Sequence, residues 1–462
     1  MNKISLLTKL MLSLFSVVLF STCSFAKVPN YHTDVIDITE AHLSPSYWLS
    51  QLEQKNVLLM SQQDIAAFNQ QLVKKNPYIS LPLSVPNPLS KTQLVEKLTA
   101  ISKPSKHARF YSDGTQVSDE NYQTYIDATN QSGIKLKNIV QYGLVVKRTA
   151  LRTFPTKDRI FKAGSDRDLD RFQESALFPG EAVAILHTSK DEQWLLVQAY
   201  NYLAWVQKSD VAVGNKTEIT AFLENEDFIV VTGSKVFTNY VPNHEKISNV
   251  QLDMGTRLPL AKRSDYGNSV YGQNPFANYI VKLPVKDSQG KLALKLTPIP
   301  RGQDVRVGYL PFTKANLIKQ SFKFLGERYG WGHDYNGRDC TGFVGEIYKS
   351  FGFIMPRNSG QQAKSVYGLN HFFAKDSDQQ SKLKIIATLQ VGDLIYIPGH
   401  VMMYLGDDKS KPYVIHDVKG LSYLDKQGDI YQGTLNGVSV TPLIPLKDYV
   451  KKITNIKRIR AK

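Results

Sequence analysis

Hydrophobic and polar residues follow three different patterns along the chain, and each pattern predicts a different kind of structure. Between residues 27 and 136, apolar residues recur at helical spacing, most clearly in SKTQLVEKLTAI (Ser90 to Ile101). Proline-rich stretches such as SLPLSVPNPLS separate the helical segments, because proline cannot continue a helix. We therefore expect a small helical N-terminal region, or wrapping arm, that carries no visible chemistry.

From residue 137 the pattern changes to short β-rich runs that contain a repeat. Val145 and Leu151, in GLVVKRTALRTFPT, recur as Val230 and Val236 in DFIVVTGSKVFTNYVP, each 85 positions later. Regular repetition of short strands and turns is typical of small barrels placed in tandem. The repeat therefore predicts two barrels, over residues 137–213 and 222–303, and disfavours the alternative of one larger sandwich.

The third pattern, over residues 304–462, combines helices with a sheet. TKANLIKQSFKFLGERYGW has apolar residues at near-helical spacing, and Thr313 can cap this helix. A Gly-rich turn and the stretch RDCTGFVGEIYKSFGF follow, and VGDLIYIPGHVMMYLG and YVIHDV then look like strands. This order predicts an α+β domain, so that the whole chain is multidomain α+β.

The first 26 residues have the layout of a secretory signal peptide: a basic start, an apolar run of eleven residues and small residues before Lys27. Cleavage after Ala26 would remove Cys23. Lipidation of Cys23 is the alternative, but FSTC is a poor match for a lipoprotein signal. No other long apolar stretch follows, so we expect an exported chain, periplasmic or secreted, without a transmembrane anchor.

Charge gives a broad indication of the partner. The chain has a formal net charge of +16, and apart from the KKITNIKRIRAK tail its basic residues are scattered. A basic balance suits acidic partners, although a generic effect on solubility remains an equal alternative. No nucleic-acid motif is present, so carboxylate-rich cell wall is the more natural partner for an exported protein. We expect a monomer that needs no cofactor and no metal.

Cys340 is the only cysteine after the predicted cleavage site. An unpaired cysteine is a liability in an oxidising compartment, which favours a reactive role over a buried, inert thiol. Phe343, Ile347 and their neighbours form the apolar stripe of a helix, and Asp339 is a good N-cap. Cys340 then lies in the first turn, where the helix dipole and free N–H groups favour a thiolate and can stabilise an oxyanion.

A thiolate nucleophile needs a base, and the base needs an orienting partner. His400 is the best candidate for the base, since it follows a Pro-Gly turn and precedes the strand-like HVMMYLG. His416, in YVIHDV, can orient His400. Asp417 is the runner-up, but as the strand neighbour of His416 it should face the other way.

Four stretches, YGWGHDYNGRDCTGF, PRNSGQQ, GDLIYIPGHVMMYLG and VIHDVKG, resemble the NlpC-type cell-wall cysteine peptidases, which have a papain-like fold. GLVVKRTALRTFPT and YLAWV resemble bacterial SH3 domains placed upstream. The resemblance covers nearly all of the mature chain: an N-terminal stabilising domain, two SH3-type barrels and a catalytic domain. It implies that Cys340 is the nucleophile, His400 the general base and His416 the third, orienting residue.

The resemblance also implies a substrate and a set of residues around it. Relatives with this architecture cleave the amide between γ-D-glutamate and a diamino acid in peptidoglycan stem peptides, and many require a free L-Ala amine. Tyr329 matches a tyrosine beside the oxyanion site, and Asn358 and Ser359 match positions that line the substrate pocket. His333 replaces a usual glycine and could narrow the pocket or contact the diamino acid, with a solvated loop histidine as an equal alternative. Thr341 replaces a usual serine and keeps its hydroxyl.

Two other functions are alternatives. A catalytically quiet protein could bind the cell wall through SH3-type barrels alone, but the complete set of Cys340, His400 and His416 argues against it. An acyltransferase on the same fold would use the same thioester chemistry. Its sign would be a lipid-facing apolar segment near the site, and the sequence shows none. We therefore expect a cysteine endopeptidase that acts on peptidoglycan peptides.

Overall fold

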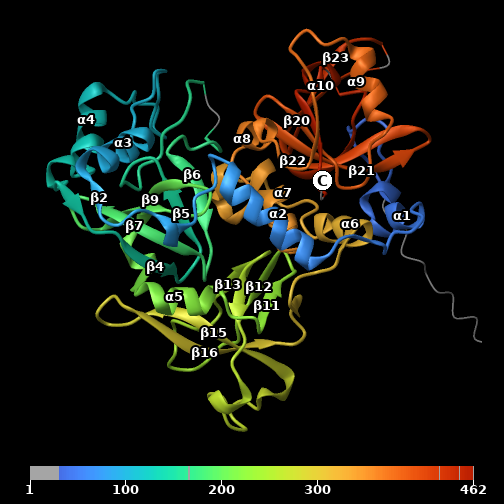
Figure 1. Cartoon of the computed structure of the whole chain (residues 1–462). Helices are drawn as coiled ribbons and strands as arrows, with labels where there is room; N and C mark the ends of the chain where they lie inside the picture. The colour runs from blue at the N-terminus through green and yellow to red at the C-terminus, as the bar shows by residue number, and fades with distance from the viewer. Residues whose placement is uncertain (1–30, 165–166, 426, 447, 461–462) are drawn as a thin grey trace, which may run out of the picture.

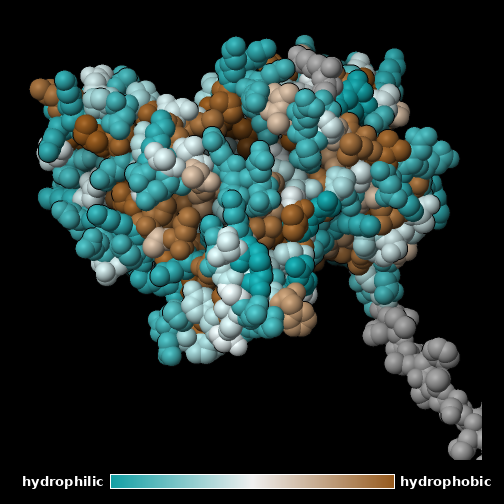
Figure 2. Space-filling model, turned by 60° about the horizontal axis from the view of Figure 1, so that its bottom comes forward, coloured by the Kyte–Doolittle hydropathy of each residue, from teal (hydrophilic) through white to brown (hydrophobic). Residues whose placement is uncertain are grey.

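The computed structural model describes residues 31–164, 167–425, 427–446 and 448–460. The predicted signal peptide and Cys23 lie outside these residues. Within them, no helix is both long enough and apolar enough to cross a bilayer. The face of the molecule in Figure 2 is mostly hydrophilic, and its apolar residues form small groups.

The C-terminal part is built on a six-stranded antiparallel sheet in the order β19-β24-β20-β21-β22-β23 (Figure 1). Its strands are β19 (Leu369–Phe372), β20 (Leu394–Ile397), β21 (His400–Asp408), β22 (Lys411–Leu424), β23 (Ile430–Pro442) and β24 (Asn455–Arg458). The helices are α6 (Lys314–Phe322), α7 (Cys340–Lys349), α8 (Ser359–Lys364), α9 (Gln379–Ile386) and α10 (Tyr449–Lys452). Helix α7 packs on β21 and β22, and α6 packs on α7. The predicted α+β architecture is therefore confirmed.

The two long helices of this domain begin and pack as their sequences predict. The Thr313 hydroxyl accepts a hydrogen bond from the Asn316 N–H and so caps α6. The Asp339 carboxylate caps α7 in the same way, through the Gly342 N–H at 2.8 Å. The apolar stripe of α7 is completely buried against the sheet, from Phe343 to Phe351. Burial of several large side chains, worth about 1.5–3 kcal/mol each, holds the N-terminus of α7 in place.

The first β-rich segment forms one seven-stranded sheet in the order β10-β4-β7-β8-β9-β5-β6. Its strands are β4 (Gln141–Val145), β5 (Thr149–Arg152), β6 (Gln173–Leu177), β7 (Ala182–Thr188), β8 (Trp194–Gln198), β9 (Leu203–Gln207) and β10 (Val211–Gly214). Valine and leucine side chains from these strands build its core. Strand β6 lies against the turn of 3-10 helix η7 (Trp331–Asn336) that precedes α7.

The second β-rich segment is split into three small sheets, β14-β11-β17, β12-β13 and β15-β16. Its elements are α5 (Lys216–Leu223), β11 (Phe228–Val231), β12 (Lys235–Phe237), β13 (Gln251–Asp253), β14 (Arg257–Pro259), β15 (Asn278–Lys286), β16 (Leu292–Pro300) and β17 (Val305–Val307). The repeated phrases fall on equivalent strands, since β4 contains Val145 and β11 contains Val230, and the following strands β5 and β12 contain Leu151 and Val236. Both β-rich segments contribute to one hydrophobic cluster, which joins them.

The predicted N-terminal helical region is divided between two cores. Helix α1 (Pro45–Ser50), strand β1 (Leu58–Met60) and helix α2 (Gln62–Lys75) share the hydrophobic core of α6 and α7. Helices α3 (Lys91–Ile101) and α4 (Asp119–Ala128) pack instead on the first β-rich segment. Two short pairings complete the segment, β1 with β18 (Phe312–Thr313) and β2 (Leu89–Ser90) with β3 (Lys137–Asn138). The N-terminal residues therefore pack against both the C-terminal domain and the first β-rich segment.

Candidate active site

The candidate nucleophile, Cys340, is the first residue of α7 and has 6% of its surface exposed. The Asp339 cap fixes this end of the helix. The backbone N–H of Val401, the residue after His400, forms a hydrogen bond with the thiol group and favours its ionised form. The start of α7 therefore meets the start of β21, which brings the predicted nucleophile beside the predicted base.

A chain of hydrogen bonds leads away from His400 across three neighbouring strands. His400 begins β21 directly after the Pro-Gly turn, and its Nε2 lies 2.8 Å from Nδ1 of His416 on β22. Nε2 of His416 lies 3.0 Å from the Thr441 hydroxyl on β23. This arrangement leaves Nδ1 of His400 as the ring nitrogen that can accept a proton. No sequence motif points to Thr441, because only the pairing of β22 with β23 brings it to His416.

The ionisation of the resting site differs from the sequence-based expectation. Burial, together with the adjacent Asp339 carboxylate, raises the pKa of the Cys340 thiol to about 12. Burial also lowers the pKa of His400 to about 4. Both shifts favour a thiol and a neutral imidazole over the charged pair. Desolvation and the neighbouring anion therefore oppose the thiolate that the helix N-terminus favours.

Tyr329 and Asp417 also lie near the thiol. Tyr329 is held by a backbone bridge to Arg338 and a hydrogen bond to the Asn436 carbonyl, and its pKa is raised by burial and by Cys340. Asp417 is fully buried, and its carboxylate has no hydrogen-bond partner among the described residues. Burial and the Asp339 charge raise the pKa of Asp417 well above its ordinary value. Asp417 has no contact with His400, as its position on β22 predicted.

A buried arginine clamps the residue that caps the nucleophile's helix. Arg357 donates to both oxygens of Asp339, at 3.1 and 2.7 Å, and to the Thr341 hydroxyl at 2.6 Å. Its Nε donates to Ser175 on β6 of the first β-rich segment at 2.7 Å. The charge of Arg357 and the two hydrogen bonds that it donates strongly lower the pKa of Asp339. Asp339 therefore stays ionised beside the nucleophile. Sequence reasoning missed this role, although Arg357 lies in the PRNSGQQ motif.

His333 is buried with both ring nitrogens engaged, which corrects the expectation that it contacts substrate. It is 5% exposed, its Nδ1 faces Arg357 at 3.2 Å and its Nε2 faces Glu346 at 3.1 Å. Neither ring nitrogen is left for a ligand. The ring packs on the first turn of α7, where a Cβ on Gly342 would come within 2.6 Å of it. Burial lowers the pKa of His333 well below its ordinary value, so its role is structural.

The predicted substrate end lies where the first β-rich segment meets α8. Asn358 caps α8 and Ser359 begins it, and both side chains are at least partly accessible. Tyr202 forms a hydrogen bond with Asn358 and donates its hydroxyl to Glu174. Glu174 was not expected from the sequence, because no motif marks it. Trp205, on β9, is fully buried and donates to Ser102, so it does not line this end.

Two protein families match parts of the chain. Residues 326–440 match the NlpC/P60 family, and residues 158–207 match the SH3 domain of the SH3b1 type. The chain contains an NlpC/P60 domain. The NlpC/P60 match includes Cys340, His400 and His416 and ends one residue before Thr441.

Two curated proteins that resemble this chain come from Bacillus species. A γ-D-glutamyl-L-lysine dipeptidyl-peptidase of Bacillus cereus is 29% identical over 184 residues, which cover 40% of this chain and 48% of the relative. A protein of the same name from Bacillus subtilis is 25% identical over 258 residues, which cover 51% of this chain and 70% of the relative. The chain therefore spans about half the length of the first of these relatives and more of the second.

A solved structure extends the likeness to nearly the whole chain. The NlpC/P60 endopeptidase of Photobacterium damselae subsp. piscicida superposes with a TM-score of 0.72, over 90% of this chain and 97% of that one. The identity is 18%, so the comparison shows a shared fold. The order of an SH3b domain and a C-terminal NlpC/P60 domain agrees with the fold class expected from the sequence.

Proposed function

We propose that the protein is a cysteine endopeptidase that hydrolyses peptide amides of peptidoglycan outside the cytoplasm. The observation that carries this proposal is the chain His400–His416–Thr441, which starts beside the thiol of Cys340 and leaves one imidazole nitrogen free to accept a proton. A nucleophile, a base and an orienting group in hydrogen-bond sequence are what amide hydrolysis through a thioester needs. The family matches support the same chemistry.

The reaction would proceed in two halves. Nδ1 of His400 takes the proton of the Cys340 thiol as sulfur attacks the carbonyl carbon of the scissile amide. The tetrahedral intermediate collapses when the C–N bond breaks, and His400 returns the proton to the leaving amine. A water molecule, deprotonated by His400, then hydrolyses the thioester and releases the acid. Tyr329 and the backbone N–H groups at the start of α7 are the donors for the oxyanion.

The scissile bond that we propose is the amide between γ-D-glutamate and a diamino acid, with a free L-Ala amine before the glutamate. The supporting feature is the junction of Asn358, Tyr202 and Glu174, which offers an amide oxygen, a hydroxyl and a carboxyl group to an ammonium ion. Asn358 alone would bind the ammonium through a neutral oxygen. Burial raises the pKa of Glu174, and a bound ammonium would favour its ionised form, so that Glu174 would supply the charge that Asn358 lacks.

The test of the reaction uses the full chain, intact sacculi and the soluble peptide L-Ala-γ-D-Glu-diaminopimelate. We expect mass spectrometry to show cleavage after glutamate by the wild type, and none by a folded Cys340→Ala variant, because the nucleophile and its base act as a unit. Substantial hydrolysis by the alanine variant would overturn the assignment of Cys340. Binding to sacculi without cleavage by the wild type would favour a wall-binding protein instead.

The preference for a free amine has its own measurement. Acetylation of the L-Ala amine removes one charge-assisted hydrogen bond, about 1.5–3 kcal/mol, so we expect kcat/KM to fall roughly 10- to 150-fold. Glu174→Gln should reduce this discrimination and leave the rate on the acetylated peptide nearly unchanged. Equal rates on the free and acetylated peptides would mean that the groove is open at this end, and would favour intact wall as the substrate.

A further inference from the structure

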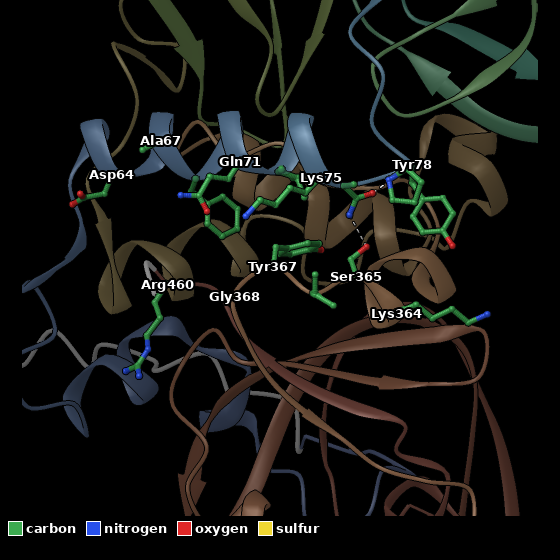
Figure 3. A pocket seen from close by; sticks show the side chains of 15 residues that line it. Asp64, Ala67, Gln71, Lys75, Tyr78, Lys364, Ser365, Tyr367, Gly368 and Arg460 are labelled. Atoms are coloured by element: carbon green, nitrogen blue, oxygen red, sulfur yellow. Dashed lines mark hydrogen bonds between the residues drawn. The ribbon is translucent and has the colours of Figure 1, made fainter.

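Asp417 on β22 is a titratable group that the proposed reaction leaves unused, and its surroundings set it apart from the charges at the surface. Lys364 and Arg460, for example, extend away from the hollow between α2 and the loop after α8, where water solvates them (Figure 3). The Asp417 side chain is completely buried, and neither of its oxygens has a hydrogen-bond partner among the described residues. A carboxylate is costly in such a place, which favours the neutral acid.

The register of β22 turns Asp417 toward the start of α7. Helix α7 packs on β22, and Ile415 belongs to the hydrophobic core that α7 shares with the sheet. Residues two apart on a strand share a face, so Asp417 lies on the α7 face as well. Its charge acts there on Cys340, the first residue of α7, and on Tyr329. Asp417 is therefore close enough to the nucleophile to influence its ionisation.

The charged groups around Asp417 are mostly negative. The carboxylates of Asp339 and Glu327 oppose its ionisation, whereas the Arg338 guanidinium favours it. Its strand partner on β23 is the apolar Val438. Arg338 is already paired with three carboxylates, those of Glu327, Asp253 and Glu346. Burial and, after it, the two nearby carboxylates therefore raise the pKa of Asp417 well above its ordinary value.

Two carboxyl groups near one thiol thus have opposite preferences. Asp339 accepts two hydrogen bonds from Arg357 and is held ionised as the cap of α7. Asp417 has no such donor among the described residues and favours the neutral form. Carboxyl groups whose surroundings separate their protonation in this way commonly divide two tasks in an active site. The cap of α7 needs one anion, and a second anion would only add repulsion beside the sulfur.

We propose that Asp417 is a positioning residue that acts on the nucleophile through its charge: its neutral acid permits attack by Cys340, and its carboxylate suppresses attack. The effect on turnover rests on the proposed function. During attack the thiol proton passes to His400, and negative charge moves from sulfur to the carbonyl oxygen of the substrate. Asp417 forms no bond to substrate and exchanges only a proton with solvent. Its carboxylate would repel both developing charges, so the reaction should slow as pH rises through the pKa of Asp417.

The first test follows the thiol itself and needs no peptide substrate. Iodoacetamide reacts with the thiolate, and mass spectrometry of the Cys340 peptide of the full chain gives its rate between about pH 5 and about pH 10. Asp417→Asn removes the titrating charge in a side chain of the same shape. We expect the variant to react as fast as the wild type at acid pH and about tenfold faster at alkaline pH, because a nearby like charge raises a thiol pKa by about one unit. A ratio near one at every pH would overturn the proposal.

Two further variants control this measurement. Asp417→Val removes the charge with a side chain that suits the neighbouring Val438 and Ile415, so it should reproduce the rates of Asp417→Asn and replaces that variant if the amide prevents folding. Asp376→Asn makes the same change of charge at an exposed position and should react as the wild type does. A ratio near one in Asp417→Val, or an equal increase in Asp376→Asn, would also contradict the proposal.

Hydrolysis of L-Ala-γ-D-Glu-diaminopimelate provides the second test. We expect kcat of the wild type to fall by up to about tenfold per pH unit at alkaline pH, with no such fall in Asp417→Asn and a similar KM in both. Inactivity of a folded Asp417→Asn variant at the optimum of the wild type would mean that the carboxyl group takes part in the chemistry, which overturns the proposal. No cleavage by the wild type at any pH, together with the expected alkylation rates, would refute the proposed function and leave the control of the thiol by Asp417 supported.

Discussion

Arg357 shows how a residue remote from the chemistry can set the geometry of the nucleophile. It is almost fully buried, and it joins Asp339 and Thr341, at the start of α7, to Ser175 on β6 of the first β-rich segment. Its positive charge also favours the ionised thiol, against the opposite effect of Asp339. The Arg357–Asp339 pair therefore holds the N-cap of α7 in place. The Arg357 charge also limits how far the Asp339 charge raises the pKa of Cys340.

This pairing predicts strong coupling between Arg357 and Asp339. Arg357→Gln should lower the free energy of unfolding by about 3–5 kcal/mol, since it leaves a buried carboxylate without a charge partner. Arg357→Gln combined with Asp339→Asn should recover part of this loss, because no unpaired charge remains. Urea unfolding of the two single variants and the double variant measures the coupling. Strictly additive losses would show that the two side chains do not act as a pair.

At the scale of elements, three strands deliver one hydrogen-bond chain to the helix that carries Cys340. β21 supplies His400, β22 supplies His416 and β23 supplies Thr441. A strand pair holds its register through many backbone bonds, so side chains on neighbouring strands keep their relative positions with little loss of entropy. The second β-rich segment is tied to the same helix, because Arg338 donates to Asp253 at 2.8 Å and to Glu346 at 2.7 Å.

The strand arrangement predicts a role for Thr441 that acts through His416. Thr441→Val removes the hydroxyl that His416 Nε2 faces, so the tautomer of both histidines is less well fixed. We expect kcat to fall about tenfold and KM to change little, as for the loss of one hydrogen bond of about 1–1.5 kcal/mol. Thr434→Val, at an exposed position on the same strand, is the control. A rise in KM with kcat unchanged would instead place Thr441 in substrate binding.

At the scale of the whole molecule, the buried His333 and His416 and the half-buried His400 link stability to pH. The pKa values of His333, His400 and His416 are all lowered by burial, so the folded state binds protons less readily than the unfolded chain. Their contribution to stability is present above the unfolded pKa of about 6.5 and is lost as pH falls below it. For His400 the loss continues down to a pH of about 4.

We therefore expect the free energy of unfolding to decrease between pH 6.5 and 4.5. Each histidine that stays neutral in the folded state contributes up to about 1.4 kcal/mol per pH unit. His333→Gln should reduce the slope by about one such contribution, and His107→Gln, at an exposed position, is the matched control. Urea unfolding at a series of pH values gives the slopes. An unchanged slope in His333→Gln would mean that His333 is protonated in the folded protein.

Local sequence determined the features that depend on neighbouring residues. The cap at Asp339, the start of α7 at Cys340 and the buried stripe after it follow from helix periodicity and capping, which involve contacts within a few positions. The position of His400 at the start of a strand follows equally from the Pro-Gly turn. The repeat at 85 positions likewise indicates, from local pattern alone, that β4 and β5 are equivalent to β11 and β12.

Only the tertiary structure decided the features that join distant parts of the chain. Thr441 lies 25 residues from His416, and Glu174 reaches Asn358 only through Tyr202 and the docking of the barrel. The local pattern at the start of α7 predicted a lowered pKa for Cys340. Burial and the Asp339 carboxylate instead raise this pKa, and burial depends on the segments that pack around α7. Charge, solvation and hydrogen-bond partners at a buried site are set by which segments fold against it, and that information is spread over the whole sequence.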